Sequence, residues 1–350
     1  MTFKWRYVVL FILIVVAGIG AVTYRLTFTP YGRLDYRAAL SIHFLTFNYE
    51  LKPDPKSDFS LTVPLNMFFV VSSILPKEEV SKFQDIKIPG ESADIPARAY
   101  WPEHWDRKKP LPVLVYFHGG GFVLGDVKTF DALARSLSNA TNGIVVSVDY
   151  RLAPAHPYPA AVNDSYAALT WVSRNAQSLG GDATKLVVAG DSAGGNLATV
   201  VCLKARDQGG PAIAAQILYY PATDLTDKYY ASKDHFGDGY GLLKQEEAAF
   251  HRAYIGHIQN TTDPYISPLY APSLAHLPPV LVFTEGFDPL TDSTKAYIER
   301  LQQEGVAVTW HHYPETIHGF MSVPLFSQRR LALEETAQFW NRLFLEQTPK

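Results

Sequence analysis

The chain has 350 residues, of which 47% are hydrophobic and 19% charged, and its formal net charge is −3. This composition is that of a folded protein with a large core and excludes an intrinsically disordered chain. The near-neutral charge and the lack of a basic run argue against a nucleic-acid partner, and a single cysteine, Cys202, excludes an intramolecular disulfide.

The N-terminal segment differs from the rest of the chain. Val8–Val22 holds no polar side chain, with Lys4 and Arg6 before it and Arg25 after it. With the flanking aromatic residues it reaches the length of a short membrane-spanning helix. We expect residues 1–24 to be a single-pass membrane anchor with the rest of the chain on the non-cytoplasmic side, because the basic residues lie ahead of the apolar run. A cleaved signal, which would leave a secreted or periplasmic protein, and a buried helix are the alternatives.

The next region is rich in aromatic residues and is interrupted by prolines. Its pattern predicts one helix over Arg33–Phe47, followed by a loop that contains Pro53, Pro55 and Pro64.

From Phe83 onward, short apolar runs alternate with longer helical patterns, which predicts an α/β fold with a mostly parallel sheet of about eight strands and helices on both faces. The expected strands are Gln84–Ile88, Ala97–Trp101, Val113–Phe117, Ile144–Val148, Lys185–Ala189, Ala215–Tyr219, Val280–Thr284 and Val306–His311. The expected helices are Thr129–Asn139, Ala160–Gln177, Gly195–Asp207, Lys244–Tyr254, Asp292–Glu304 and Arg330–Phe344. In such sheets ligands bind beyond the carboxyl ends of the strands, so the residues that follow each apolar run are the candidates for chemistry.

The first candidate is Ser192, which lies between Gly190 and Gly194 where a strand pattern becomes a helical pattern. A serine at so sharp a turn takes a strained backbone that only small neighbours tolerate, and its Oγ is held out above the sheet. This arrangement predicts a nucleophile. A plain glycine turn is the alternative.

The second candidate is the glycine run of His118–Phe122, directly after the expected strand Val113–Phe117. Glycines leave backbone N–H groups bare, and an acyl-transfer enzyme needs such donors for the negative oxygen of its tetrahedral intermediate. A plain loop and a phosphate-binding loop are the alternatives, but neither G-x-G-x-x-G nor GxxxxGK occurs here. We therefore expect an oxyanion hole.

The base that would activate Ser192 is sought among eleven histidines. His318 follows the last expected strand and is adjacent to a glycine, whereas His311 and His312 lie within or at the end of that strand. His318 is the predicted base.

An imidazole base needs a carboxylate to hold its tautomer. Asp288 stands just beyond the strand Val280–Thr284, Glu285 is too close to that strand, and Asp292 begins or caps the next helix. Asp288 is the predicted acid, and the order serine, acid, histidine is that of α/β-hydrolases.

With these segments in view, the chain resembles the hormone-sensitive lipase family of serine esterases. The resemblance extends from about Phe83 to the C-terminus, and the order of its motifs makes it specific. It rests on FHGGGF (117–122), VDYRLAPAHPYPAA (148–161), GDSAGGNLA (190–198), FDPL (287–290) and HGF (318–320).

The resemblance implies an α/β-hydrolase fold with a helical cap and cofactor-free cleavage of carboxylic esters. By position, Ser192 matches the nucleophile, His318 the general base and Asp288 the orienting acid. The oxyanion hole then corresponds to the backbone N–H groups of Gly120, Gly121 and Ala193, with Gly119 shaping the loop.

The cap of this family implies a cap segment over residues 25–82 and a cap insertion at about 225–256 of a catalytic domain spanning 83–350. Ala155 stands where the family commonly has an acid, which puts an ion pair in doubt but not the catalytic residues. The N-terminal anchor is similar to that of the arylacetamide deacetylase branch.

We therefore expect a serine hydrolase that acts on small-molecule esters with short or medium acyl chains through an acyl-enzyme. An amidase or deacetylase with the same triad, and a catalytically inactive ligand-binding receptor on this fold, are the alternatives. The sequence leaves the oligomeric state open.

Overall fold

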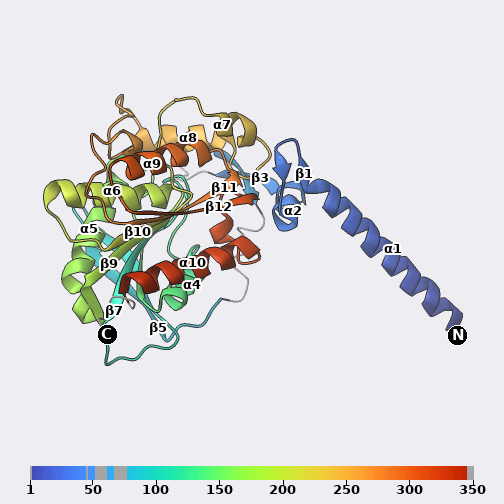
Figure 1. Cartoon of the computed structure of the whole chain (residues 1–350), viewed down its shortest axis with the longest axis horizontal. Coiled ribbons are helices and arrows are strands. Elements are labelled where there is room, and N and C mark those ends of the chain that lie inside the picture. Colours follow the sequence, from blue (N-terminus) through green and yellow to red (C-terminus); the bar gives the residue numbers. More distant parts are fainter. Residues whose placement is uncertain (1, 45, 52–60, 67–76, 345–350) are drawn as a thin grey trace.

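The computed structural model describes residues 2–44, 46–51, 61–66 and 77–344, and its core is one eight-stranded sheet (Figure 1). The strands lie in the order β12-β11-β10-β9-β7-β8-β6-β5. They are β5 (Lys82–Pro89), β6 (Asp94–Trp101), β7 (Leu111–Phe117), β8 (Ile144–Val148), β9 (Gly181–Asp191), β10 (Ala215–Tyr219), β11 (Val280–Phe287) and β12 (Val308–Ile317). The strands from β12 to β8 pair in parallel, and β6 is antiparallel to both β5 and β8. This sheet confirms the predicted fold class.

Helices cover both faces of the sheet. They are α4 (Asp131–Thr141), α5 (Ala160–Asn175), α6 (Ala193–Gln208), α7 (Ala231–Phe236), α8 (Lys244–Ile255), α9 (Thr291–Gln303) and α10 (Ser327–Phe344). Side chains of α5, α6 and α9 pack in one buried cluster with Val113 and Val115 of β7, and those of α4 and α10 pack in another with Leu114 and Tyr116. Because successive side chains of a strand point to opposite faces, the apolar run of β7 supports both layers.

Two element boundaries near the strand ends differ from the prediction. β12 continues to Ile317 instead of ending at His311, and its pairing with β11 shifts register between Glu285 and Phe287. Such an irregularity lets a strand continue past polar residues that break the apolar pattern. β9 begins at Gly181 instead of Lys185. The apolar pattern marks only the buried C-terminal part of this strand, and most of the preceding residues are more exposed.

The N-terminal region also contains strands that the sequence analysis missed. The expected helix is shorter, α2 (Tyr36–Phe44). β3 (Thr46–Leu51) begins at the end of the range expected to be helical and continues into the expected loop, where it pairs antiparallel with β4 (Leu61–Asn66). The prediction of a loop was therefore wrong for these two segments. Pro64 was read as a breaker, but in a two-stranded sheet a proline on an outer edge interrupts no further pairing. Pro53 and Pro55 lie outside the described residues.

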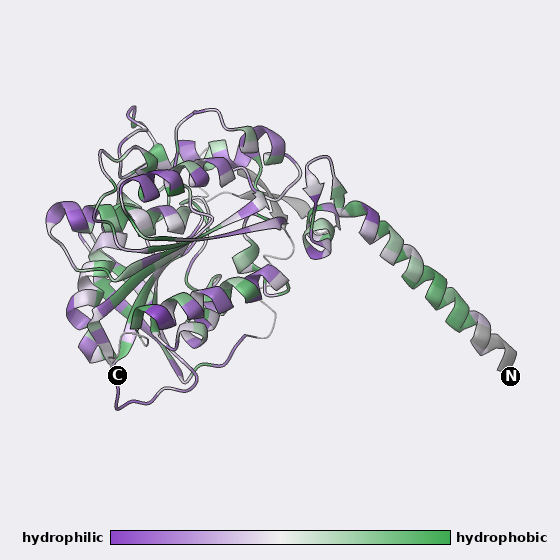
Figure 2. Cartoon of the chain, in the orientation of Figure 1, coloured by the Kyte–Doolittle hydropathy of each residue, from purple (hydrophilic) through white to green (hydrophobic). Residues whose placement is uncertain are grey.

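Helix α1 (Thr2–Leu26) extends away from the α/β body (Figure 1). Its Tyr7–Leu26 stretch is long and apolar enough to cross a membrane, and none of it is buried against the protein. Figure 2 shows this apolar character along most of the helix. The alternative of a helix buried in the core is therefore wrong, whereas an anchor and a signal sequence both agree with an exposed helix.

The segment after α1 returns to the protein body. A short hairpin of β1 (Phe28–Thr29) and β2 (Gly32–Arg33) leads into α2, and Leu34, Ala38 and Ala39 are buried in the same cluster as α4 and α10. The Asp35 N–H donates to the Glu315 carbonyl at 2.6 Å. Part of the expected cap segment thus packs on a face of the sheet.

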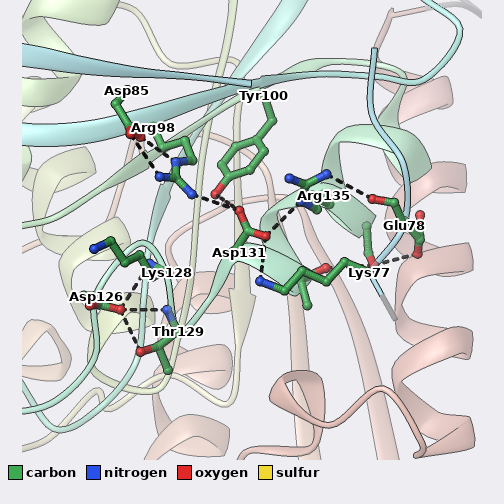
Figure 3. Close-up of polar contacts among 12 residues, drawn as sticks. Lys77, Glu78, Asp85, Arg98, Tyr100, Asp126, Lys128, Thr129, Asp131 and Arg135 are labelled. Atoms are coloured by element: carbon green, nitrogen blue, oxygen red, sulfur yellow. Dashed lines mark hydrogen bonds and ion pairs between the residues drawn. The ribbon is translucent and has the colours of Figure 1, made fainter. Parts of the chain in front are cut away.

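A buried carboxylate joins the antiparallel edge of the sheet to α4 (Figure 3). Asp131 is 3% exposed, and the nitrogens of Lys77, Arg98 and Arg135 lie 3.0, 3.3 and 2.9 Å from its oxygens. The Tyr100 hydroxyl donates to it at 2.9 Å. These contacts outweigh the effect of burial, so the pKa of Asp131 is lowered and the carboxylate stays charged.

Candidate active site

Ser192 occupies the turn between β9 and α6 and has the strained backbone that the sequence predicts. Its φ of 54° lies in the left-handed region, which non-glycine residues rarely adopt. The turn is held by the Ser192 N–H, which donates to the Tyr219 carbonyl of β10 at 2.9 Å. Its glycines are required: a Cβ on Gly194 would lie 2.0 Å from the Phe117 carbonyl oxygen, and one on Gly190 would lie 2.1 Å from that of Gly194.

The predicted base and acid lie beside this serine, although they come from distant parts of the chain. His318 directly follows β12, and its Nε2 is 2.9 Å from Ser192 Oγ. Its Nδ1 is 3.0 Å from Asp288 Oδ2, just beyond β11. The other oxygen of Asp288 accepts the Leu290 N–H at 2.8 Å, which orients the carboxylate. The three predicted side chains form one chain of contacts.

Two opposing influences set the pKa of His318. Burial of the imidazole lowers it, but the charge of Asp288, its hydrogen bond and the more distant charges of Asp191 and Glu247 raise it. The net result is a raised pKa, because the neighbouring carboxylates favour the protonated ring. The arrangement thus stabilises an imidazolium next to Ser192.

The glycine run folds over the same point. The backbone N–H groups of Gly120, Gly121 and Ala193 donate to no acceptor among the described residues, and all three residues line the cavity that contains Ser192. The Gly119 N–H instead donates to Asp191 Oδ1 at 2.9 Å. Its donor is already occupied, so Gly119 supports the loop and is not available to an oxyanion.

Asp191 is a structural residue that the sequence analysis missed. It is buried beneath Ser192 and accepts hydrogen bonds from Gly119 N–H and, at 2.5 Å, from the Tyr116 hydroxyl. Burial raises its pKa to about 6, although these hydrogen bonds and the charge of His318 lower it. It ties the glycine loop to the serine turn. Its position directly before Ser192 was the available signal.

His118 lies near the site but does not face it. Its ring is fully buried and stacked between Phe130 and Tyr150, with centroid distances of 5.2 and 4.4 Å. Burial lowers its pKa to about 4, so the ring is neutral at pH 7. It packs beneath the glycine loop and cannot reach Ser192 as a base.

The rejected candidates lie where the sequence placed them. His311 and His312 are inside β12, and Glu285 is inside β11, fully buried, with a pKa raised by burial and by the nearby charge of Asp288. Asp292 belongs to the first turn of α9, where its Oδ2 accepts the Ser232 N–H at 2.9 Å.

A cavity of about 390 Å³ opens above Ser192 and His318. Its walls are mostly apolar, with Phe122, Leu124 and Phe250 among them, and Glu246, Glu247 and His251 of α8 also line it. The sequence analysis did not single out these residues of α8. Among the described residues, no cluster of three or more His, Cys, Asp or Glu side chains suits a metal ion.

Comparisons with known proteins agree with the observed fold. A family model for the alpha/beta hydrolase fold matches residues 114–322. The chain is 42% identical over 251 residues to the esterase LipI of Mycobacterium tuberculosis, covering 71% of this chain and 78% of that protein. It is 43% identical over 235 residues to the carboxylesterase NlhH of the same organism, covering 66% and 73%.

Solved structures agree as well. A hyperthermophilic esterase from the archaeon Pyrobaculum calidifontis is 41% identical, with a TM-score of 0.73 over 79% of this chain and 90% of that one. The carboxylesterase EstE1, cloned from a metagenomic library, is 37% identical with a TM-score of 0.75, over 79% and 95% of the two chains. The chain therefore belongs to the alpha/beta hydrolase fold family and is a carboxylesterase-like hydrolase.

Proposed function

We propose that this protein hydrolyses carboxylic esters through an acyl-enzyme formed on Ser192, with His318 as general base and Asp288 as the acid that orients it. The observation that carries this proposal is the continuous contact from Ser192 Oγ to His318 Nε2 and from His318 Nδ1 to Asp288. In the tautomer with a proton on Nδ1, the ring donates to Asp288 and accepts from the serine hydroxyl.

The reaction has two halves. Ser192 Oγ attacks the ester carbonyl while His318 takes its proton, and the N–H groups of Gly120, Gly121 and Ala193 stabilise the oxyanion. His318 then protonates the leaving alcohol. Water attacks the acyl-enzyme with His318 again accepting the proton, which releases the acid and restores Ser192.

Two properties of the cavity support small substrates. Its volume of about 390 Å³ is near the lower end of the range for small-molecule sites, and its walls are mainly apolar. We expect kcat/KM, measured on p-nitrophenyl esters, to be highest for short or medium acyl chains and to fall for long ones.

The test of the nucleophile is Ser192→Ala. We expect this variant to lose hydrolysis of p-nitrophenyl butyrate and labelling by a fluorophosphonate probe. Ser322→Ala is the matched control, since Ser322 lines the same cavity but contacts neither His318 nor Asp288 among the described residues. Full activity in Ser192→Ala would remove Ser192 from this role.

The amidase alternative uses the same residues. A matched ester and anilide with a common acyl group separate the two activities, and we expect the ester to be preferred.

The N-terminal α1 is proposed to anchor the protein as a single pass, as in the arylacetamide deacetylase branch, with the catalytic domain on the non-cytoplasmic side.

A further inference from the structure

The apolar cavity above Ser192 contains two glutamates that the mechanism does not use. Glu246 and Glu247 are adjacent on α8, each is 5% exposed, and both line the cavity. Burying a carboxylate costs free energy unless a partner compensates its charge. The two residues differ in this respect.

Glu247 has a compensating partner. The Lys233 ammonium of α7 lies 2.8 Å from its Oε1. His251, one turn further along α8, lies 3.9 Å from the same oxygen, and burial lowers the pKa of its imidazole, so that ring is neutral at pH 7. The charge of Glu247 is thus balanced by Lys233 within the protein.

Glu246 has no such partner. Its Oε2 accepts the Leu243 N–H at 2.9 Å, which fixes the side chain at the first turn of α8. No basic side chain among the described residues forms an ion pair with it. Burial raises its pKa to about 7, although the Leu243 N–H and the charge of His318 lower it. A cation placed beside Glu246 would favour the carboxylate and remove this penalty.

Aromatic rings surround the same space. Phe250 lies one turn after Glu246 on α8, and Phe122, Phe130 and Phe326 also line the cavity. A carboxylate in a cavity lined by aromatic residues is a chemistry that binds alkylammonium groups, because both the negative charge and the π-systems attract a cation. A purely apolar acyl pocket would need no carboxylate.

We propose that Glu246 determines the specificity of this cavity and selects carboxylic esters that carry a positively charged amine or ammonium group. This inference rests on the proposed function, since it places the ester carbonyl at Ser192 and the cationic group at Glu246. Glu247, neutralised by Lys233, supports the position of α8 instead of binding the cation.

Two pairs of isosteric substrates test the proposal. On the alcohol side the pair is butyrylcholine and 3,3-dimethylbutyl butyrate, and on the acyl side it is p-nitrophenyl 6-aminohexanoate and p-nitrophenyl heptanoate. The readout is the ratio of kcat/KM for the cationic ester to kcat/KM for its neutral partner. We expect the protein to favour the cationic ester in at least one pair.

In Glu246→Gln that ratio should fall by about tenfold, equivalent to about 1.4 kcal/mol, because the amide keeps the shape and loses the charge. Glu299→Gln is the matched control, since Glu299 is exposed on α9 and does not line the cavity, and its ratio should stay unchanged. A ratio that is the same in Glu246→Gln as in the unsubstituted protein for both pairs would overturn the proposal.

A binding measurement separates this proposal from the hydrolytic mechanism. Calorimetric titration of Ser192→Ala with tetraethylammonium should show binding, and the double variant with Glu246→Gln should bind at least about tenfold more weakly. Binding that the second substitution leaves unchanged, or no binding at all, contradicts the role of Glu246. Failure to hydrolyse any of the four esters, with this binding intact, contradicts only the proposed function.

Discussion

The protonation of one imidazole, His318, governs the proposed reaction. Asp288 accepts its Nδ1 proton, and the negative charges around the ring outweigh the effect of burial, so its pKa is raised above 6.5. A base works only in its neutral form. The same carboxylate that stabilises the imidazolium during catalysis therefore also makes the resting enzyme sensitive to acid.

The pH profile tests this balance. As pH falls through the raised pKa of His318, the ring becomes protonated and kcat/KM should fall, with the acid limb above pH 6.5. Asp288→Asn removes the charge that raises the pKa, so the limb should move to lower pH and kcat should fall by roughly 10³–10⁴-fold. In Asp292→Asn, which removes another acid near this strand end, the limb should stay in place. An unmoved limb in Asp288→Asn would contradict the assignment.

Contacts between elements depend on a few buried polar groups as well as on the apolar layers. The Asp131 carboxylate connects α4, β6 and the segment before β5, whereas Asp85, at the outer end of the same network, has a side chain that is 69% exposed (Figure 3). Removing the buried Asp131 carboxylate leaves the positive charges of its partners uncompensated. Removing the exposed Asp85 carboxylate leaves a positive charge that water can solvate.

We expect Asp131→Ala to lower the free energy of unfolding by about 3 kcal/mol, and Asp85→Ala to lower it by at most about 1 kcal/mol. Urea denaturation followed by circular dichroism measures both values. Equal losses in the two variants would show that the buried carboxylate has no special role. Because the Asp131 side chain does not line the cavity, KM for p-nitrophenyl butyrate should be unchanged in either variant.

At the scale of the whole molecule, α1 and α2 differ in their relation to the α/β body. α1 has no buried residues in its apolar stretch, whereas Ala38 and Ala39 of α2 are fully buried with α4 and α10. Removal of α1 exposes no core, but removal of α2 uncovers an apolar face of the sheet layer.

Truncation distinguishes these roles. Deletion of residues 1–26 should move the protein from the membrane fraction to the soluble fraction and keep kcat/KM for p-nitrophenyl butyrate within about twofold. Deletion of residues 1–44 should instead lower the midpoint of thermal unfolding. If expression of the full sequence instead yields a soluble protein that lacks its N-terminal residues, α1 is a cleaved signal and the anchor is contradicted.

The sequence was informative wherever local chemistry decided the structure. The apolar runs predicted all eight strands of the sheet, and the glycines around Ser192 predicted its strained turn, because only small residues fit where α6 approaches β7. β3 and β4 were missed because both are short and β4 contains Pro64, so neither has a distinctive local pattern. Asp288 and His318 were predicted from their places after strands, since parallel strands bring their carboxyl ends together.

Other features depended on the tertiary structure, because they arise from groups far apart in the chain. The sequence does not show which N–H groups of the glycine run are free, whereas the structure shows that the Gly119 N–H donates to Asp191. From the sequence, Glu246 would be taken for a surface residue of an amphipathic helix. In the structure it lines the same cavity as Ser192. The sequence by itself determined the fold class and the residue types of the reaction. Burial, charge pairing and the lining of the cavity were decided only when the chain folded, since they depend on which distant side chains exclude water from one another.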